Sequence, residues 1–317
     1  MKSLFLSSLL ALGLLAVPAQ AAEYPAKPIT LMTAFNAGGG SDVSHRLLEK
    51  FAKGVFDQPI VVTYKAGAGG EIGWTWLIGA KADGYNIGGV DLPHIVLQPM
   101  LRPEGQPGYK TEQLNPLCCL VFDPDILIVS EKSPFKSFGE LIEYAKANPG
   151  KVKVATVGKL TGDHLFLMQI EKLTGAKFTQ VPYSGSGKAI PALLSGEVDA
   201  YFGSGSSFLR MEKTRGLAIG SKERYELCPD VPTFIEQGYA IESGKYRGLA
   251  TPQNIPAEAR QYLETKFAEL CANPEYQKAV KSSGLMPQFQ TGKAFGEIIR
   301  TEGEQAQKIL EAYGLLK

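Results

Sequence analysis

Four glycine-rich segments constrain the fold of this chain most strongly, because each lies between a strand-like stretch and a helix-like stretch. They span residues 36–42, 66–73, 158–163 and 184–188. In a parallel α/β sheet, loops of this kind gather at the carboxyl ends of the strands, where ligands bind. Two of the loops fall in each half of the chain. The sequence therefore predicts two facing half-sites with a cleft between them.

The first half of the chain predicts a βαβαβ unit with parallel strands and right-handed crossovers. The expected strands are residues 29–35, 60–64 and 85–90. One helix follows Gly40, and the next begins near Ile72. The first helix has one apolar face, made of Val43, Leu47, Leu48, Phe51 and Val55.

The second half repeats this alternation. We expect strands at 126–129, 153–157, 178–181, 198–202 and 217–220, and helices at 137–147, 161–174 and 186–194. Ser137 and Glu140 form an S-x-x-E capping box at the start of the first of these helices. Three helical patterns follow without matching strands, at 256–271, 274–283 and 292–315. Residues 249–250 are expected to form a return strand, and residues 102–116 a loop.

The N-terminus is typical of a secretory signal peptide. Lys2 precedes an apolar run over residues 4–17, and Ala19-Gln20-Ala21 is a small-residue cleavage site. The run is shorter than the ~20 residues that a membrane-spanning helix needs. We therefore expect cleavage before Ala22 and a periplasmic location, with residues 1–21 removed.

Length and charge narrow the classes of partner. The chain of 317 residues exceeds a usual single-core domain, so two domains are expected. A formal net charge of +1 without a basic run argues against nucleic acid and anionic membranes as partners. Its three histidines have no metal-ligand spacing, so no metal site is expected.

The four cysteines leave two alternatives open. Cys118, Cys119, Cys228 and Cys271 would meet an oxidising compartment after export, which permits one disulfide. Adjacent cysteines are poor partners for each other, because a vicinal bridge strains the peptide. The other alternative is that some or all four are free, buried, small apolar side chains.

Helix N-termini at the glycine loops favour an anionic ligand. Their free N–H groups and partial positive charge suit anions, and glycine allows the backbone to approach a ligand closely. No loop has the G-x-x-x-x-G-K-[ST] spacing, and no G-x-G-x-x-G opens the first helix, so no nucleotide cofactor is expected. Any single loop could serve the fold alone; four in register favour a site.

An ordered set of motifs resembles the tripartite tricarboxylate transporter solute-binding family, also called the Bug family. The set runs from Tyr24 to near the C-terminus. It comprises the stretches at 24–29, 35–42, 67–73, 83–85, 181–187, 196–199 and 229–233.

The resemblance implies an α/β periplasmic-binding-protein fold of type II-like form, with two lobes joined by two crossing hinge strands. We map the crossings near Asp125 and Tyr246. Lobe one would comprise residues 23–125 and 247–317, and lobe two residues 126–246. It also implies capture of a small organic acid, delivery to a membrane permease, and no cofactor. We expect a monomer. A sensor for a signalling receptor is the alternative within the binding class.

Several positions depart from the family pattern. Asn36 and Ala37 stand where proline is usual in the first loop, and Tyr246 stands where tryptophan is frequent. Glu71 replaces a common asparagine and would repel a second carboxylate or receive a ligand amine. Lys159 and Lys188 lie in or beside loops where neutral residues are common.

Candidate ligand-binding residues come from all four loops and from the end of the third strand. The loop backbone would supply N–H groups, and hydroxyl, imidazole and ammonium groups would supply further contacts. The candidates are Phe35, Asn36, Gly39, Gly40, Ser41, Asp42, Ala68, Gly69, His94, Thr156, Lys159, Thr161, Tyr183, Ser184, Gly185 and Ser204.

An exported hydrolase is the rival from another functional class. Ser41 and His45 are four residues apart on one helix and so share a face. A triad also needs an orienting acid and an oxyanion hole, and Asp42 points elsewhere on the helix. No G-x-S-x-G motif is present. The sequence therefore favours a binding protein over an enzyme.

Overall fold

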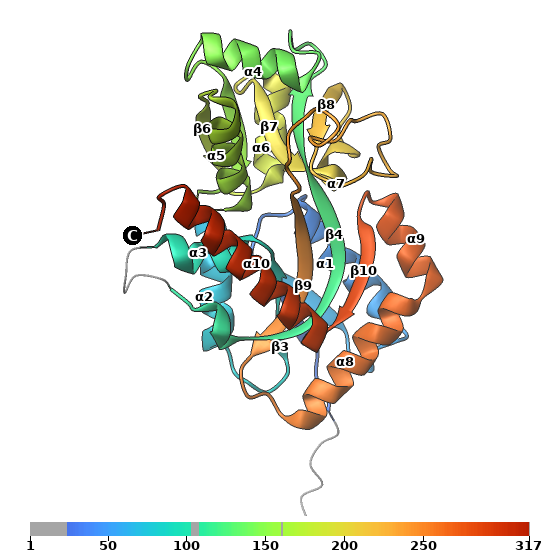
Figure 1. Cartoon of the computed structure of the whole chain (residues 1–317). Helices are drawn as coiled ribbons and strands as arrows, with labels where there is room; N and C mark the ends of the chain where they lie inside the picture. The colour runs from blue at the N-terminus through green and yellow to red at the C-terminus, as the bar shows by residue number, and fades with distance from the viewer. Residues whose placement is uncertain (1–23, 103–107, 160, 317) are drawn as a thin grey trace, which may run out of the picture.

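The computed structural model describes residues 24–102, 108–159 and 161–316. The expected signal peptide, residues 1–21, lies outside this range. Within it, no helix is long and apolar enough to cross a membrane. The described chain forms two α/β lobes, one above the other in Figure 1, with two long strands running between them.

The first lobe contains the predicted βαβαβ unit. Strands β1 (Ile29–Thr33), β2 (Ile60–Tyr64) and β3 (Asn86–Asp91) alternate with helices α1 (Gly40–Ala52) and α2 (Glu71–Gly79). β1 pairs in parallel with both β2 and β3, as predicted. A short helix, η1 (Ala68–Gly70), precedes α2, and α3 (His94–Leu101) follows β3. The sequence pattern does not predict α3, because Pro99 lies inside this eight-residue helix and proline usually ends a helix.

The second lobe repeats the parallel arrangement. Strand β5 (Lys153–Val157) pairs in parallel with β6 (Thr179–Tyr183) and β7 (Ala200–Ser204). The other elements are α4 (Phe138–Ala147), α5 (Gly162–Thr174), α6 (Ser186–Ser195), the short α7 (Gly205–Phe208) and β8 (Thr214–Ile219). All of these except α7 were predicted to within a few residues. Each long helix starts directly after a strand and a short loop, so the sequence pattern was clear.

Two long strands join the lobes. β4 (Leu114–Ser130) pairs antiparallel with β9 (Gly244–Pro252) in the first lobe and with β7 and β8 in the second. The sheet is therefore mixed, with the order β2-β1-β3-β9-β4-β7-β5-β6. The prediction that residues 102–116 form only a loop was wrong at its end. Residues 111–113 form η2 (Thr111–Gln113), and β4 begins at Leu114.

The C-terminal segment returns to the first lobe. It contains α8 (Ala257–Ala272), α9 (Pro274–Ser282), β10 (Met286–Thr291) and α10 (Gly292–Ala312). The prediction of helices without strands was wrong, because β10 pairs antiparallel with β4. Pro287 and several polar residues hide β10 in the sequence. A proline is tolerated there because β10 pairs only with β4 and lies at an edge.

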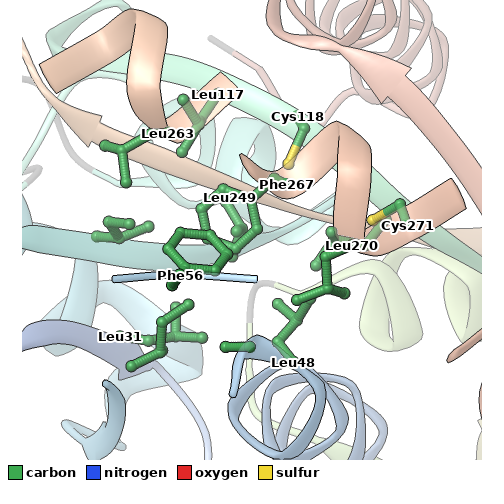
Figure 2. Close-up of a cluster of buried hydrophobic side chains, with 14 of the residues drawn as sticks. Leu31, Leu48, Phe56, Leu117, Cys118, Leu249, Leu263, Phe267, Leu270 and Cys271 are labelled. Carbon is green, nitrogen blue, oxygen red and sulfur yellow. The ribbon is translucent and has the colours of Figure 1, made fainter. Parts of the chain in front are cut away.

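Each lobe has its own apolar core. In the first lobe, α1 and α8 pack against the same face of the sheet, and their shared core includes Leu48, Phe267, Leu270 and Leu249 (Figure 2). A second core fills the space around β7 and helices α4 and α5. Two separate cores agree with the expectation, from the length of the chain, of more than one domain.

The structure contains all four cysteines as free, buried thiols. Of the two alternatives, one disulfide or free buried cysteines, the structure therefore has the free cysteines. Burial raises the pKa of Cys119, Cys228 and Cys271 to about 12, in spite of hydrogen bonds that lower it at Cys119 and Cys271. These thiols consequently stay protonated near neutral pH and act as apolar packing groups.

Candidate functional site

Three of the four glycine-rich segments, those at 36–42, 158–163 and 184–188, contribute to the lining of one cavity of about 40 Å³, which we call the cleft cavity. It lies where loops from each lobe meet strand β9. Its lining is Phe35, Asn36, Gly39, Gly40, Ser41, Asp91, His94, Val157, Asp163, Gly185, Ser186, Tyr201, Gly203, Ser204, Ser207, Lys245 and Arg247.

Two helices, one from each lobe, begin at the cleft cavity. Gly39 is the N-cap of α1, and Gly185 is the N-cap of α6. Neither helix receives a side-chain cap at this end. The first N–H groups of a helix have no partner within it, so both ends offer donors and a partial positive charge.

The start of α1 is held by side chains from three strands, β2, β3 and β9. Ser41 Oγ donates to Asp91 Oδ1 at 2.8 Å and accepts from Arg247 Nη1 at 2.9 Å. Asp42 accepts from Gly38 N at 2.8 Å and from Tyr64 Oη at 2.5 Å. Asp42 therefore shapes the loop from outside, while Ser41 belongs to the wall of the cavity.

Arg247 is a buried cation in the floor of the cavity. Its guanidinium pairs with Asp91 through Nη1 at 2.5 Å and with Asp123 through Nη2 at 3.0 Å. Burial alone would lower the pKa of Arg247. The two carboxylates raise it by more than burial lowers it, so the pKa lies above its usual value. Burial alone would raise the pKa of Asp91; Arg247 and His94 outweigh it and hold that pKa below its usual value.

Lys245 is the second buried cation, two residues earlier on β9. Its Nζ pairs with Asp125 and lies 2.9 Å from Oδ1 of Asp163. Burial lowers the pKa of Lys245, but Asp125 and Asp163 outweigh it and raise the pKa above its usual value. Lys245 therefore stays charged and links strand β9 to helix α5.

Three buried polar atoms in the wall of the cavity make no hydrogen bond within the described residues. They are Arg247 Nε, His94 Nδ1 and Asp163 Oδ1, the last of which has only its ion pair with Lys245. Burial lowers the pKa of His94 to about 4, so its ring is neutral at pH 7. An unmatched buried polar atom is unfavourable, so these atoms favour a polar ligand.

The lobes touch around the cavity. Asn36 Nδ2 donates to Ser184 Oγ at 2.7 Å, and Gln98 Nε2 donates to the carbonyl of Lys159 at 3.1 Å. A Cβ on Gly187 would lie 2.6 Å from the carbonyl oxygen of Ala37. The structure is therefore a closed arrangement in which backbone meets backbone across the cleft.

Half of the sequence-predicted residues line the cavity. These are Phe35, Asn36, Gly39, Gly40, Ser41, His94, Gly185 and Ser204. The other eight lie outside its lining: Asp42, Ala68, Gly69, Thr156, Lys159, Thr161, Tyr183 and Ser184.

Most of this second group have structural partners instead. Thr161 is the N-cap of α5, and Thr156 Oγ1 accepts from Gln180 Nε2 at 2.8 Å. The Tyr183 hydroxyl donates to Glu197, which together with burial raises the pKa of Tyr183 to about 12. The Lys159 and Lys188 side chains are exposed.

Sequence reasoning missed the charged floor of the cavity. Asp91, Asp163, Lys245 and Arg247 all line it, yet none was a candidate. One signal was present: Asp123 and Asp125 are two residues apart, as are Lys245 and Arg247. Alternate residues of a strand share a face, and Asp123 lies opposite Lys245 in the β4–β9 register.

Ser41 and His45 do not form a catalytic pair. The Nδ1 atom of His45 lies 2.7 Å from Thr33 Oγ1, while Ser41 is bonded to Asp91 and Arg247. Within the described ranges, no group of three or more metal-ligating side chains gathers. The arrangement is suited to hydrogen bonding and charge pairing with a small polar molecule.

Comparison with known proteins gives a consistent set of relatives. A family model described as "Tripartite tricarboxylate transporter family receptor" matches residues 45–315. A Cupriavidus necator protein, "UPF0065 protein in gbd 5'region", is 30% identical, covering 97% of this chain and 94% of its own. BugT of Bordetella pertussis is 34% identical, covering 87% of this chain and 86% of its own.

Solved structures share the fold. The periplasmic binding protein BugD superimposes with a TM-score of 0.85 at 27% identity, covering 93% of this chain and 100% of its own. MatC from Rhodopseudomonas palustris, with bound malate, has a TM-score of 0.84 at 23% identity over 90% of this chain and 100% of its own. An R. palustris protein with adipate has a TM-score of 0.86 at 23% identity over 92% and 98%.

Proposed function

This chain belongs to the tripartite tricarboxylate transporter receptor family, and we propose that it captures a small organic carboxylate in the cleft cavity. One observation carries the proposal: two helix N-termini from opposite lobes and the unpartnered Nε of Arg247 converge on the same cavity. Donors and positive partial charge from three directions suit a carboxylate group.

Related folds with bound acids support this class of ligand. Malate and adipate are carboxylates, and each is held by a protein of this fold. At 23% identity those structures show the fold alone. The proposal that this chain binds a carboxylate is therefore supported by the hydrogen-bond donors of its own cavity.

We also propose the lobe boundaries and the hinge. Lobe one comprises residues 23–125 and 247–317, and lobe two residues 126–246. The two crossings fall in β4 at Asp125 and in β9 at Tyr246, and these strands run between the lobes in Figure 1. Hinge bending there would separate the α1 and α6 N-termini and open the cavity to solvent.

Capture would then proceed by docking and closure. An acid that enters the open cleft first meets the donors of one lobe, and closure brings the donors of the other lobe onto it. Exclusion of water strengthens each hydrogen bond. The closed form becomes populated because the ligand binds it better than the open form. We propose that the exported protein then delivers the acid to a membrane permease that recognises the closed shape.

A thermal-shift screen of the purified protein against small organic acids tests capture. A ligand that binds only the folded state raises stability by about 2.7 kcal/mol at a hundred times its dissociation constant. We expect one or more acids to raise the melting temperature by several degrees without being consumed. If no acid in the panel shifts it, the proposed function fails.

Two glycine variants make the screen specific for the cleft cavity. Gly39 has backbone angles open to any residue, and a Cβ there would face Ser186 Oγ at 3.0 Å. Gly39→Val should fill the cavity and abolish the shift. Gly79→Val is the control, because a Cβ at Gly79 meets nothing within 4 Å. A shift that survives in Gly39→Val would place binding elsewhere.

A further inference from the structure

We infer that the acid captured in the cleft cavity also carries a protonated amino group, so that the ligand is a small amino acid with Asp163 as the receptor of its ammonium. This inference rests on the proposed function and narrows its ligand class. It follows from the balance of charge around the cavity, from the place of Asp163 in the cavity wall and from the buried Nε donor of Arg247, which has no partner among the described residues.

Carboxylates outnumber cations in the buried floor. Lys245 and Arg247 face Asp91, Asp123, Asp125 and Asp163, and all six side chains are less than 10% exposed. The neighbouring rings of His45 and His94 add no positive charge near pH 7, since burial lowers the pKa of each to about 4. Burial raises the pKa of Asp125, so this carboxylate takes up a proton more readily than an ordinary aspartate. Even with that proton in place, three carboxylates share two cations.

This excess of negative charge opposes a ligand that brings only carboxylates. Burying an unpaired charge is unfavourable, and a plain dicarboxylate would add further negative charge to a floor already short of cations. A ligand with one ammonium group relieves the excess and can still place its carboxylate on the helix N-termini.

Asp163 is positioned to receive the ammonium. It is 0% exposed and lines the cavity, and its Oδ1 has one charged partner among the described residues, Lys245 Nζ at 2.9 Å. Its other oxygen, Oδ2, accepts from Val157 N at 2.9 Å, which fixes the carboxylate in place. A carboxylate oxygen has two lone pairs, so Oδ1 can accept a charge-assisted hydrogen bond from a ligand ammonium beside its pair with Lys245.

The same wall of the cavity also offers hydrogen-bond donors for a carboxylate. Arg247 Nε is a buried donor without a partner, and the α1 and α6 N-termini supply further donors. The cavity therefore offers both an acceptor for an ammonium and donors for a carboxylate, which together match a zwitterion.

Glu71, which the sequence suggested as a receptor for a ligand amine, is occupied elsewhere. Its carboxylate pairs with Arg102 and accepts from Gly108 N at 2.9 Å. It is not part of the cavity lining. The recognition of an amine therefore falls to Asp163 in this chain.

Matched pairs of acids test the inference by calorimetry on the full protein. Each pair differs only in the amino group: alanine and propionate, 4-aminobutyrate and butyrate, glutamate and glutarate. We expect the aminated member of the tightest-binding pair to bind about tenfold or more tightly than its partner, since a charge-assisted hydrogen bond is lost in the partner. Equal or tighter binding of the plain acid would overturn the inference and leave the proposed function intact. Failure of every acid to bind would overturn both.

Two isosteric variants test the role of Asp163. Asp163→Asn keeps an acceptor for Val157 N, and Lys245 keeps its pair with Asp125. We expect it to lower the affinity ratio within the pair by about tenfold. Asp123→Asn is the matched control, because it removes an equally buried carboxylate that does not line the cavity.

The control should leave the ratio within about threefold of wild type. If both variants lower the ratio equally, general charge and not contact with Asp163 explains the preference, and the assignment of Asp163 is overturned. If neither variant folds, the wild-type comparison of matched pairs still decides the ligand class.

Discussion

At the scale of single residues, Arg247 is a buried cation that pairs with two buried carboxylates. It is 6% exposed, and its Nη1 and Nη2 atoms pair with Asp91 and Asp123. Removing one partner of a buried ion pair leaves the other charge unpaired in a site of low dielectric constant. We therefore predict that Arg247→Met lowers the free energy of unfolding by about 3–5 kcal/mol. Urea denaturation at pH 7 measures it.

Arg300 provides the control for that variant. It also pairs with two carboxylates, those of Glu297 and Glu304, but on the exposed face of α10. Solvent screens such pairs, so Arg300→Met should leave the free energy of unfolding almost unchanged. Similar losses for the two arginines would mean that burial of Arg247 is not what makes its ion pairs matter.

His45 makes stability depend on pH. Burial lowers its pKa to about 4 in the folded state, against about 6.5 in an unfolded chain. As pH falls below 6.5 the unfolded chain takes up the proton first, so stability is lost between pH 6.5 and 4. At pH 5 the loss from His45 is on the order of 2 kcal/mol.

His45→Asn should remove this part of the pH dependence. Asparagine keeps a polar partner for Thr33 Oγ1 but does not titrate. Urea denaturation at pH 7 and at pH 5 should show a smaller difference for the variant than for wild type. His94 remains and titrates in the same sense, so part of the dependence should persist. An unchanged difference would show that His45 protonates without unfolding the chain.

At the scale of elements, the sequence predicted those segments whose pattern is local. Residues 60–64 and 153–157 were predicted with the observed bounds of β2 and β5, since each is apolar and followed by a glycine loop. The C-terminal end of α5 was predicted correctly because Gly175 adopts the left-handed conformation there.

The long strand β4 and its partner β10 could not be predicted in the same way. β4 contains Pro116 and Pro124, and its pairing with β9 shifts register twice. Its inward-facing Asp123 and Asp125 resemble a loop when taken alone. They are tolerated only because Arg247 and Lys245, more than 100 residues away in the chain, pair with them. This pairing is a property of the tertiary fold.

The predicted cap at the start of α4 can be tested by mutation. Ser137 Oγ accepts from Glu140 N at 3.2 Å, as a capping box requires, while the Glu140 carboxylate accepts from Lys136 N instead of from Ser137 N. Ser137→Ala should lower the free energy of unfolding by about 1 kcal/mol. Ser282→Ala, at an exposed serine near the end of α9, should change it by less than about 0.5 kcal/mol. Equal effects in urea denaturation would show that the cap is not stabilising.

At the scale of the whole molecule, the site divides into a part that follows from sequence and a part that does not. Gly39, Ser41 and Gly185 were expected in the cleft because glycine loops mark the ends of parallel strands. Lys245 and Asp163 reach the same cavity only when two strands cross between the lobes and α5 packs beside them. The loops therefore predict where the cavity lies, and β9 supplies the cations of its floor, Lys245 and Arg247.

Closure of the two lobes can be tested with one methyl group. A Cβ on Gly187 would lie 2.6 Å from the carbonyl oxygen of Ala37, which belongs to the other lobe. Separation of the lobes relieves this clash, while neither lobe need change internally. We predict that Gly187→Ala holds the cleft open, with a larger radius of gyration by small-angle scattering and about tenfold weaker binding of the best acid from the screen.

The matched control for Gly187→Ala is Gly139→Ala, in the same second position of another helix, α4. There the nearest atom to a new Cβ is Ser137 Oγ at 3.9 Å, within the same lobe. Alanine also favours the helical state at both positions. The control should therefore keep wild-type affinity and radius of gyration. If Gly187→Ala also keeps both, contact between the α6 N-terminus and the first loop does not govern closure. The buried pair of Lys245 in the second lobe with Asp125 at the end of the first would then be a remaining link between the lobes.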